Sequence, residues 1–474
     1  MRWQPSSCVV FVGSAALTGL VSFLFNRGLI KLSSLTGDES NGLHPEELPE
    51  LPRNPSATSV SNLAFDFEGQ ACPRVYVYDI KELWDFETPL DRLRYVNPAV
   101  IWGERCKNMP DAYKTEQFSL SLIVLYKLFR SKRCRTTDNP KDADLFLVPV
   151  FPERGFRKVP RICNTSFEIS RHLVHLKPWT AHRHLILLGK MHDFANNCKW
   201  WKQPEGLLKR VMRVSHSLVV RSHWKGEFDP RTPYGPIDDS ELAPQQLTLS
   251  LDGESDSVAY PHSYSVPKPS HIHWHKQGNK TAGPRRITDT ERPLLAVFVG
   301  RVQGPYGERL RTRLVEDCTQ AGVPACKHVP LGLTERPKIC DLIALKNKAE
   351  FCITPGGLTP YRRVVFDDLL IGCIPVVFSR YMQLANPWHW GHFRNNSQIY
   401  INSNEYVAGK IGLFALLKHL VRTGETAKMR EVIQRHGHAV QYALDDFPGD
   451  AMERILIGAK LAADRSKRLM RESR

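Results

Sequence analysis

Apolar residues gather in short continuous runs along the chain. Four runs have the length and composition of strands, and they span residues 74–79, 143–150, 184–188 and 294–300. Continuous apolar runs such as 143–150 are typical of strands buried in a parallel sheet. Residues 113–130 instead repeat apolar side chains at helical spacing, at Phe118, Leu122, Leu125 and Phe129. This alternation of strands and helices predicts an α/β fold.

The alternation resumes after residue 291. Strand 294–300 leads into a helix predicted near 306–321; a strand ending at Thr354, a helix from about 360 and a strand at 373–378 follow. Residues 229–290, rich in Pro, Ser, His and Gly, are expected to form loops and the crossing between the two series. Since 474 residues exceed the usual size of one core, two domains are expected. Their predicted bounds are 73–290 and 291–440, with a C-terminal helix and basic tail at 441–474.

The N-terminus carries the longest uncharged stretch, residues 8–25. Eighteen residues in a helix span about 27 Å, which is enough to cross a bilayer core. A cleaved signal peptide is the competing interpretation, but Phe23–Arg27 is a poor small-residue cleavage site. We therefore expect residues 1–32 to form a cytoplasmic tail and signal anchor, a single transmembrane helix. Residues 33–72, rich in Pro, Ser and Glu, are expected to form a stem.

The chain is basic, with a formal net charge of +16. Such a surface attracts nucleic acid, anionic lipid or acidic polysaccharide. The sequence contains no zinc-finger spacing, no RNP-like aromatic motif and no compact basic helix, so nucleic acid is not expected as a partner.

Eleven cysteines are dispersed without any Cys-x-x-Cys pair. Ten of them follow the apolar stretch, and this usage suits a secretory compartment in which some would pair. Cys352 and Cys373 are expected to be small buried core residues. Glycosylation sequons at Asn164, Asn279 and Asn395 agree with a luminal location.

Residues 351–378 carry the most informative pattern: a strand, a Pro355-Gly356-Gly357 loop, a helix and a second strand. Glycines allow a ligand to approach the backbone closely. Thr359 can cap the helix and Pro360 suits its first position, so its free amides could bind a diphosphate. Arg362 and Arg363 would add guanidinium groups to phosphate oxygens, and Asp367 could accept hydrogen bonds from ribose hydroxyls. The alternative is a tight turn with an Arg–Asp helix pair.

The order of several motifs resembles the exostosin-like glycosyltransferase family, which includes heparan-sulfate polymerases and plant wall glycosyltransferases. Phe351–Gly357 through Gly372–Val377 is similar to its Phe-Cys-Leu-x-Pro … Gly-Cys-x-Pro-Val signature. Six further segments resemble family motifs in order; they are 75–79, 113–118, 143–149, His192-Asp193, 258–261 and 298–301. The resemblance covers about residues 73–400.

The resemblance implies a GT-B fold, in which two Rossmann-like domains face a cleft. It further implies an inverting glycosyltransferase. With the anchor and stem predicted above, the expected location is the Golgi membrane, single-pass type II with a luminal catalytic region. The donor would be a UDP-sugar bound mainly by the C-terminal domain, with no further cofactor. The acceptor would be a glycan or glycoprotein, of which an acidic glycan is one case. Function as a homo- or heterodimer is left open.

Direct displacement requires a base on the acceptor hydroxyl and positive groups on the leaving diphosphate. The candidates for the base are His192, Asp193 and Glu116; a loop turn and a helix-packing role are their structural alternatives. The predicted donor-site residues are Gly300, Arg301, Pro355, Gly356, Gly357, Arg362, Arg363 and Asp367. Asp142-Ala143-Asp144 superficially matches an Asp-x-Asp metal motif, but it opens a predicted buried strand, so no metal site is expected.

The chain departs from the family pattern at two places, Tyr361–Val364 and Phe194-Ala195. These departures keep open a second hypothesis, a catalytically silent family member that serves as a partner subunit or glycan-binding module.

Overall fold

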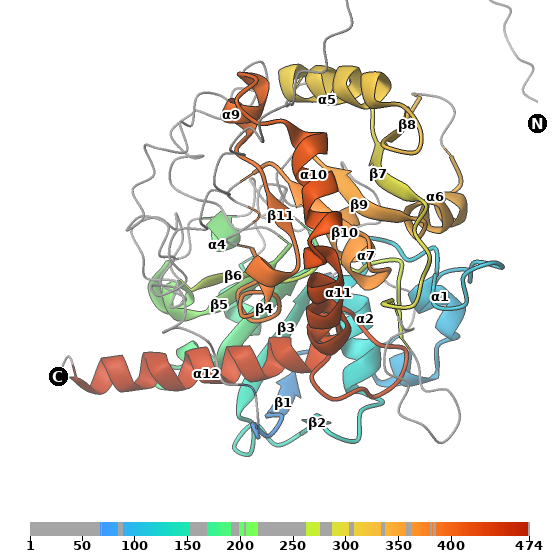
Figure 1. Ribbon diagram of the computed structural model, residues 1–474. Helices are drawn as coiled ribbons and strands as arrows, with labels where there is room; N and C mark the ends of the chain where they lie inside the picture. Colours follow the sequence, from blue (N-terminus) through green and yellow to red (C-terminus); the bar gives the residue numbers. More distant parts are fainter. Residues whose placement is uncertain are drawn as a thin grey trace, which may run out of the picture. The chain divides into compact units, whose positions relative to one another are not determined.

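A computed structural model describes residues 67, 69–83, 89–150, 168–190, 199–202, 205–216, 262–274, 287–302, 308–332, 337–356, 362–379, 382 and 385–472 (Figure 1). The chain separates into two compact units, Met1–Arg53 and Asn54–Arg474. All described residues belong to the second unit. The predicted anchor at 8–25 and nearly all of the stem lie outside them. Among the described helices, none has the length and apolarity to cross a membrane.

The first sheet has six parallel strands in the order β2-β1-β3-β4-β5-β6. Their bounds are β1 Arg74–Val77, β2 Arg135–Thr136, β3 Leu145–Val150, β4 His184–Leu188, β5 Met212–Ser215 and β6 Ser263–Ser265. Every residue of β3 and β4 is buried, as the continuous apolar runs predict. The strand predictions at 74–79, 143–150 and 184–188 are therefore confirmed.

The second sheet has five parallel strands in the order β11-β10-β9-β7-β8. Their bounds are β7 Leu294–Val299, β8 Lys327–Val329, β9 Ala349–Thr354, β10 Ile374–Val377 and β11 Ile399–Tyr400. Two parallel sheets with intervening helices confirm the α/β class. Because the contacts group both sheets into one unit, the division at residue 290 stays a prediction.

Helices connect and cover the strands. Their bounds are α1 Pro98–Trp102, α2 Leu120–Leu128, α3 Ile169–His172, α4 Lys199–Lys202, α5 Glu308–Ala321, α6 Ile339–Lys346, α7 Val364–Leu370, α9 Ser403–Val407, α10 Leu413–Arg422, α11 Glu425–His436 and α12 Ala451–Glu472. The helix predicted near 306–321 is confirmed as α5.

Two helices begin later than predicted. α2 starts at Leu120 because the backbone before it is bonded elsewhere: Tyr113 donates its N–H to the His271 carbonyl, 2.7 Å away. α7 starts at Val364, with Arg363 as its N-cap residue. Arg362 and Arg363 therefore precede the helix and do not lie in its first turn, while Thr359 and Pro360 lie outside the described residues.

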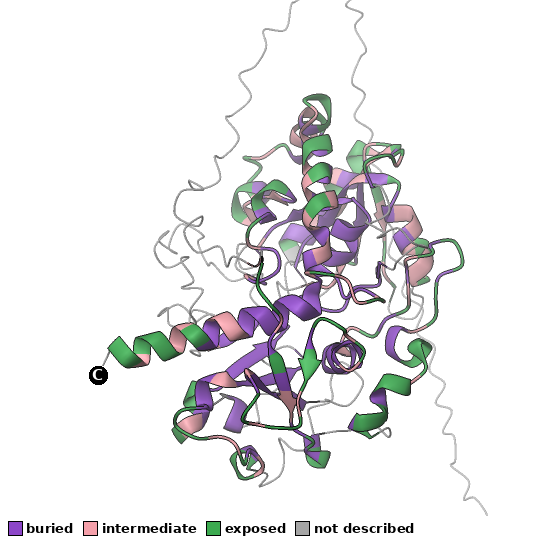
Figure 2. Ribbon diagram, turned by 90° about the horizontal axis from the view of Figure 1, so that it is seen from below, coloured by how far each residue is buried: buried purple, intermediate pink, exposed green. Residues whose placement is uncertain are grey.

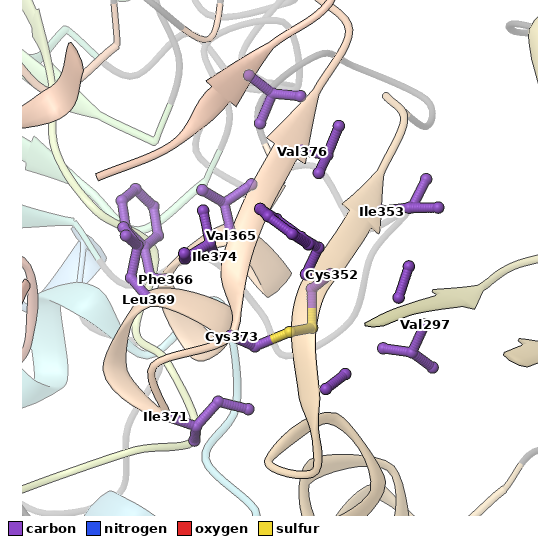
Figure 3. Packing of buried hydrophobic residues seen from close by; sticks show 14 of the residues in the cluster. Val297, Cys352, Ile353, Val365, Phe366, Leu369, Ile371, Cys373, Ile374 and Val376 are labelled. Atoms are coloured by element: carbon purple, nitrogen blue, oxygen red, sulfur yellow. A yellow bond between two sulfur atoms is a disulfide. The ribbon is translucent and has the colours of Figure 1, made fainter. Parts of the chain in front are cut away.

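The core of the second sheet surrounds β9 and β10 (Figure 3). Cys352 on β9 and Cys373 before β10 are buried there as expected, but they form a disulfide and are not free thiols. Three more disulfides join described cysteines, Cys72–Cys134, Cys106–Cys340 and Cys318–Cys326. The Cys106–Cys340 bond, with a sequence separation of 234, links the segment before α2 to α6 of the second sheet.

The C-terminal helix α12 belongs to the core of the first sheet. Its first half is buried and contacts β3 and α2, whereas its last residues are exposed (Figure 2). A Cβ on Gly458 would lie 2.5 Å from the ring of Trp388, so glycine permits this close packing. Trp388 stacks in turn on Tyr264 of β6, with ring centroids 4.4 Å apart. A helix from the end of the chain thus packs on a sheet whose strands come from the first part of the chain.

Candidate active site

The predicted donor residues of the second sheet lie at the carboxyl ends of two neighbouring strands. Gly300 and Arg301 follow β7, and Pro355 and Gly356 follow β9. In parallel α/β sheets this edge is where ligands bind. Gly357 lies outside the described residues.

Arg311 of α5 joins these two loops. Its guanidinium donates to the Arg301 carbonyl at 3.1 Å and also to the Gly356 carbonyl. A Cβ on Gly300 would lie 2.9 Å from that guanidinium and 3.0 Å from the Phe298 ring. Glycine at 300 therefore makes room for the contact that holds the loops. The Arg301 side chain itself is exposed.

Arg363 connects the start of α7 to the segment before α2. Its Nη1 donates to the Thr115 carbonyl at 2.8 Å. Burial lowers the pKa of Arg363, and the nearby carboxylates of Asp367 and Glu116 act in the opposite direction. The structure therefore brings together three of the predicted residues, Glu116, Arg363 and Asp367.

Asp367 is buried on α7. Its Oδ1 accepts the N–H of His271 at 2.6 Å, and its Oδ2 lies 3.0 Å from His271 Nδ1. Burial would raise the pKa of Asp367, but the interactions with His271 and Arg363 outweigh it and lower the pKa to about 2. Both oxygens are thus bonded to the segment that crosses from the first sheet. A role of Asp367 in ribose binding stays a prediction.

The neighbouring Asp368 has a different environment. It is fully buried and accepts hydrogen bonds from Lys346 at 2.6 Å and Thr354 at 3.0 Å. Burial raises its pKa to about 6, against the opposing effect of Lys346. Asp368 therefore ties α7 to α6 and β9, and it supports the loop without facing it.

Glu116 is the one candidate base among the described residues, since His192 and Asp193 lie outside them. It is exposed, and its Oε1 accepts the N–H of Phe118 at 3.3 Å in the turn that leads into α2. It lies before the helix, not within it, so the alternative of a helix-packing role is wrong, and its role as a base stays a prediction. An exposed carboxylate beside a guanidinium is accessible to a substrate hydroxyl.

The two carboxylates of the Asp142-Ala143-Asp144 segment bond to the chain near the start of β3. Asp142 accepts a hydrogen bond from the Asn139 side chain at 2.8 Å, and Asp144 accepts the N–H of Arg74 at 2.8 Å. Within the part of the chain that the structure describes, no group of three metal-ligating side chains occurs.

The structure adds residues that the sequence did not single out. His216 follows β5, and Lys268 follows β6 by three residues. Burial, reinforced by the Lys268 charge, lowers the pKa of His216 well below its ordinary value, so its imidazole is neutral. Lys268 and His271 fall in the stretch predicted as loops, and no pattern in the sequence identifies the strand β6 that precedes them.

Comparison with known proteins identifies the family. The model of the exostosin GT47 domain matches residues 70–390. The chain belongs to the exostosin GT47 family. The matched residues include both sheets except β11, and every predicted site residue of the chain.

Curated members of the GT47 family are similar over most of the chain. The xyloglucan-specific galacturonosyltransferase 1 of Arabidopsis thaliana is 23% identical over 72% of this chain and 49% of its own length. The probable xyloglucan galactosyltransferase GT17 of the same plant is 22% identical over 82% of this chain and 83% of its own. The chain thus spans about half of the first relative and most of the second.

Similarity to solved structures is weak. The GtfA/B complex aligns with 59% of this chain and 57% of its own, at 11% identity and a TM-score of 0.32. A score this low carries no argument about the GT-B arrangement.

Proposed function

We propose that this GT47 chain is an inverting glycosyltransferase that moves a sugar from a UDP-sugar to a glycan or glycoprotein acceptor. The observation that carries the proposal is the contact of Arg363 with the carbonyl of Thr115, the residue before Glu116, at 2.8 Å, because it brings a guanidinium to the segment that carries an exposed carboxylate. An inverting transfer needs this pair of chemistries: a base for the acceptor and positive charge for the leaving diphosphate.

In the proposed reaction the acceptor hydroxyl attacks the anomeric carbon from the face opposite the diphosphate. The base accepts the hydroxyl proton, the new glycosidic bond forms, and the bond to the diphosphate breaks. Glu116 is our first candidate for the base, and His192 and Asp193 are the others. Arg362 and Arg363 would stabilise the charge that develops on UDP without a further cofactor.

We infer a polysaccharide-type acceptor from the relatives, whose names describe galactose or galacturonic acid transfer to xyloglucan. The parallel sheets support a GT-B arrangement, with the donor near β7 and β9 and the acceptor near the first sheet. The exposed Glu116 would then lie on the acceptor side.

We propose the Golgi lumen as the location, with residues 8–25 as the anchor. The support is the pairing of all eight cysteines among the described residues, which is typical of oxidising compartments. Asn395 is exposed and begins the sequon Asn395-Asn396-Ser397. Protease digestion of intact microsomes should spare the chain, and Asn395→Gln should increase its electrophoretic mobility if the glycan is attached. Digestion of residues 73–440 without detergent would contradict this orientation.

The activity is tested with the full chain and a panel of UDP-sugars, by UDP release with and without acceptor polysaccharides. Glu116→Gln should lower turnover roughly 10²- to 10⁴-fold, the usual contribution of a positioned base, with little change in UDP affinity. Asp193→Asn is the matched variant. If only Asp193→Asn lowers turnover, Asp193 is the base and Glu116 is not.

A silent partner subunit or glycan-binding module is the second candidate. It is favoured by Asp367, whose two oxygens are already bonded to His271. It predicts glycan binding without donor turnover for any UDP-sugar in the panel.

A further inference from the structure

The residue before Glu116 is a buried threonine whose hydroxyl has two partners. Thr115 is only 2% exposed. Its Oγ1 donates at 2.7 Å to the carbonyl of Trp102, the last residue of α1. The same Oγ1 lies 2.7 Å from Nε2 of His273, which belongs to the segment after β6. The side chain of Thr115 therefore fixes its own backbone against two distant parts of the chain.

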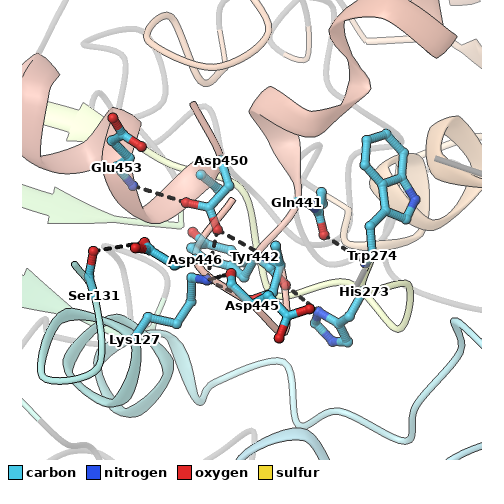
Figure 4. Close-up of polar contacts among 12 residues, drawn as sticks. Lys127, Ser131, His273, Trp274, Gln441, Tyr442, Asp445, Asp446, Asp450 and Glu453 are labelled. Carbon is cyan, nitrogen blue, oxygen red and sulfur yellow. Dashed lines mark hydrogen bonds and ion pairs between the residues drawn. The ribbon is translucent and has the colours of Figure 1, made fainter. Parts of the chain in front are cut away.

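The ring of His273 is oriented from its other side. Its Nδ1 lies 2.7 Å from the carbonyl oxygen of Tyr442 (Figure 4), and a carbonyl cannot donate, so the proton is on Nδ1. Burial lowers the pKa of His273 to about 3, so the ring is neutral and Nε2 is an acceptor. The single hydrogen of the Thr115 hydroxyl is thus the donor for both Nε2 and the Trp102 carbonyl.

The backbone of Thr115 carries the contact with the second sheet. Its carbonyl accepts Nη1 of Arg363 at 2.8 Å, and Arg363 is the N-cap residue of α7. The same peptide group contains the backbone nitrogen of Glu116, and a peptide group is planar. The position of this one peptide therefore sets where the guanidinium and the carboxylate of the candidate site lie relative to each other.

We propose that Thr115 is a positioning residue of the glycosyl transfer: its hydroxyl holds the Thr115–Glu116 peptide, and that peptide holds Arg363 and Glu116 in register. The inference rests on the proposed function, in which Arg363 binds the diphosphate and Glu116 faces the acceptor. Thr115 itself touches neither substrate. Positioning matters here because a displacement of about 1 Å between reacting groups can lower a rate by roughly 10²-fold.

A second buried threonine supplies the control for a purely structural effect. Thr180 is 6% exposed, and its Oγ1 donates to the His175 carbonyl at 2.6 Å. It precedes β4 and so lies at the amino edge of the first sheet, opposite the edge at which ligands bind. Loss of its hydroxyl resembles loss of the Thr115 hydroxyl in burial and bonding but not in location.

The test compares Thr115→Val, Thr115→Ser and Thr180→Val in the full chain. Valine keeps the shape of threonine without the hydroxyl, and serine keeps the hydroxyl. Should Thr115→Val not fold, Thr115→Ala takes its place, because it leaves space for a water between Trp102 and His273. Thermal unfolding verifies that each variant is folded. The readouts are turnover at saturating donor, with the UDP-sugar of the panel that the wild type uses fastest, and calorimetric titration of UDP.

We expect turnover to fall roughly 10- to 100-fold in folded Thr115→Val. Thr115→Ser should recover most of it, and Thr180→Val should match the wild type. Because the Thr115 carbonyl acts through Arg363, Thr115→Val should cost less in an Arg363→Ala background than in the wild type.

Two results would overturn the inference and leave the proposed function intact. One is wild-type turnover in Thr115→Val combined with lowered turnover in Glu116→Gln. The other is an equal loss of turnover in Thr115→Val and Thr180→Val, which would be a general cost of losing a buried hydroxyl. A wild type that neither binds UDP nor turns over any UDP-sugar of the panel would overturn both the inference and the proposed function.

Discussion

Two lysines of this chain are equally buried and differ in what surrounds them. Lys127 of α2 is 5% exposed and Lys268 is 6% exposed. Lys127 bonds to the carbonyls of Ala443 and Asp445 at 2.6 and 2.8 Å and to the Asp450 carboxylate at 3.0 Å (Figure 4). For Lys268, burial lowers the pKa to about 7, and the charges of Arg362 and Arg363 act in the same direction.

This difference shows that the effect of a buried lysine depends on the groups around its ammonium. Asp450 compensates Lys127 within the fold and fixes the start of α12 by accepting the N–H groups of Ala443 and Glu453. The two guanidinium charges raise the cost of the charge on Lys268. We therefore expect Lys127 to stabilise the protein through its ion pair, and we expect the charge of Lys268 to depend on pH near neutrality.

The largest effect should come from removing the compensated charge. Lys127→Met leaves the Asp450 carboxylate buried without its cation, which costs about 3–5 kcal/mol of unfolding free energy. Lys268→Met should cost less, because burial lowers the pKa of Lys268 to about 7 and weakens its preference for the charged form. Urea denaturation of both variants, with Lys460→Met as a surface control, measures the contrast. Equal losses for Lys127→Met and Lys268→Met would remove the distinction between the two lysines.

The second effect concerns the guanidinium groups of Arg362 and Arg363. Arg362→Ala/Arg363→Ala should weaken UDP binding by roughly 10- to 150-fold, or about 1.5–3 kcal/mol, since a charge-assisted contact is lost. The double variant is needed because one guanidinium can substitute for the other. Calorimetric titration measures the UDP affinity of the double variant. Lys127→Met is the control: at a temperature where this variant is folded, it should bind UDP with wild-type affinity. Unchanged affinity in the double variant would mean that this loop is only a turn.

The last effect is a pH dependence. The pKa of Lys268 is about 7 in the folded protein and near 10.4 when unfolded. The unfolded chain therefore binds more protons between these values, so this group makes stability rise with pH across that window, by at most about 1.4 kcal/mol per pH unit. Lys268→Met should flatten the rise in unfolding free energy between pH 7 and 10. An identical slope in the variant would show that Lys268 is not the titrating group.

Most of the fold could be predicted because its signals are local. The buried strands β3 and β4 are continuous apolar runs, and α5 repeats its apolar residues at helical spacing. β6 could not be predicted, because Ser263-Tyr264-Ser265 has no apolar run and lies in a stretch of loop composition. It is a strand because it pairs with β5 and stacks Tyr264 on Trp388, which is distant in sequence.

In the candidate site, too, some residues could be predicted from local sequence signals and others could not. Gly300, Pro355 and Gly356 follow predictable strands, so their position at one edge could be expected. The start of α7, the pairing of Cys352 with Cys373 and the contact of Arg363 with Thr115 depend on the three-dimensional arrangement of distant segments. Lys268 and His271 depend on it entirely, since no pattern in the sequence identifies the strand β6 that precedes them.

The packing of α12 on the first sheet has a consequence for how the protein is made. Strands β1 to β6 leave the ribosome before α12, which is separated from β6 by the whole second sheet. At about 5–20 residues per second the delay is on the order of 10–40 s. During that time the surface later covered by Ala451, Ile455 and Ala459 is exposed, and it would be a site for chaperone binding. A chain cut before residue 451 should therefore be retained by quality control, even though it contains every residue of the candidate site.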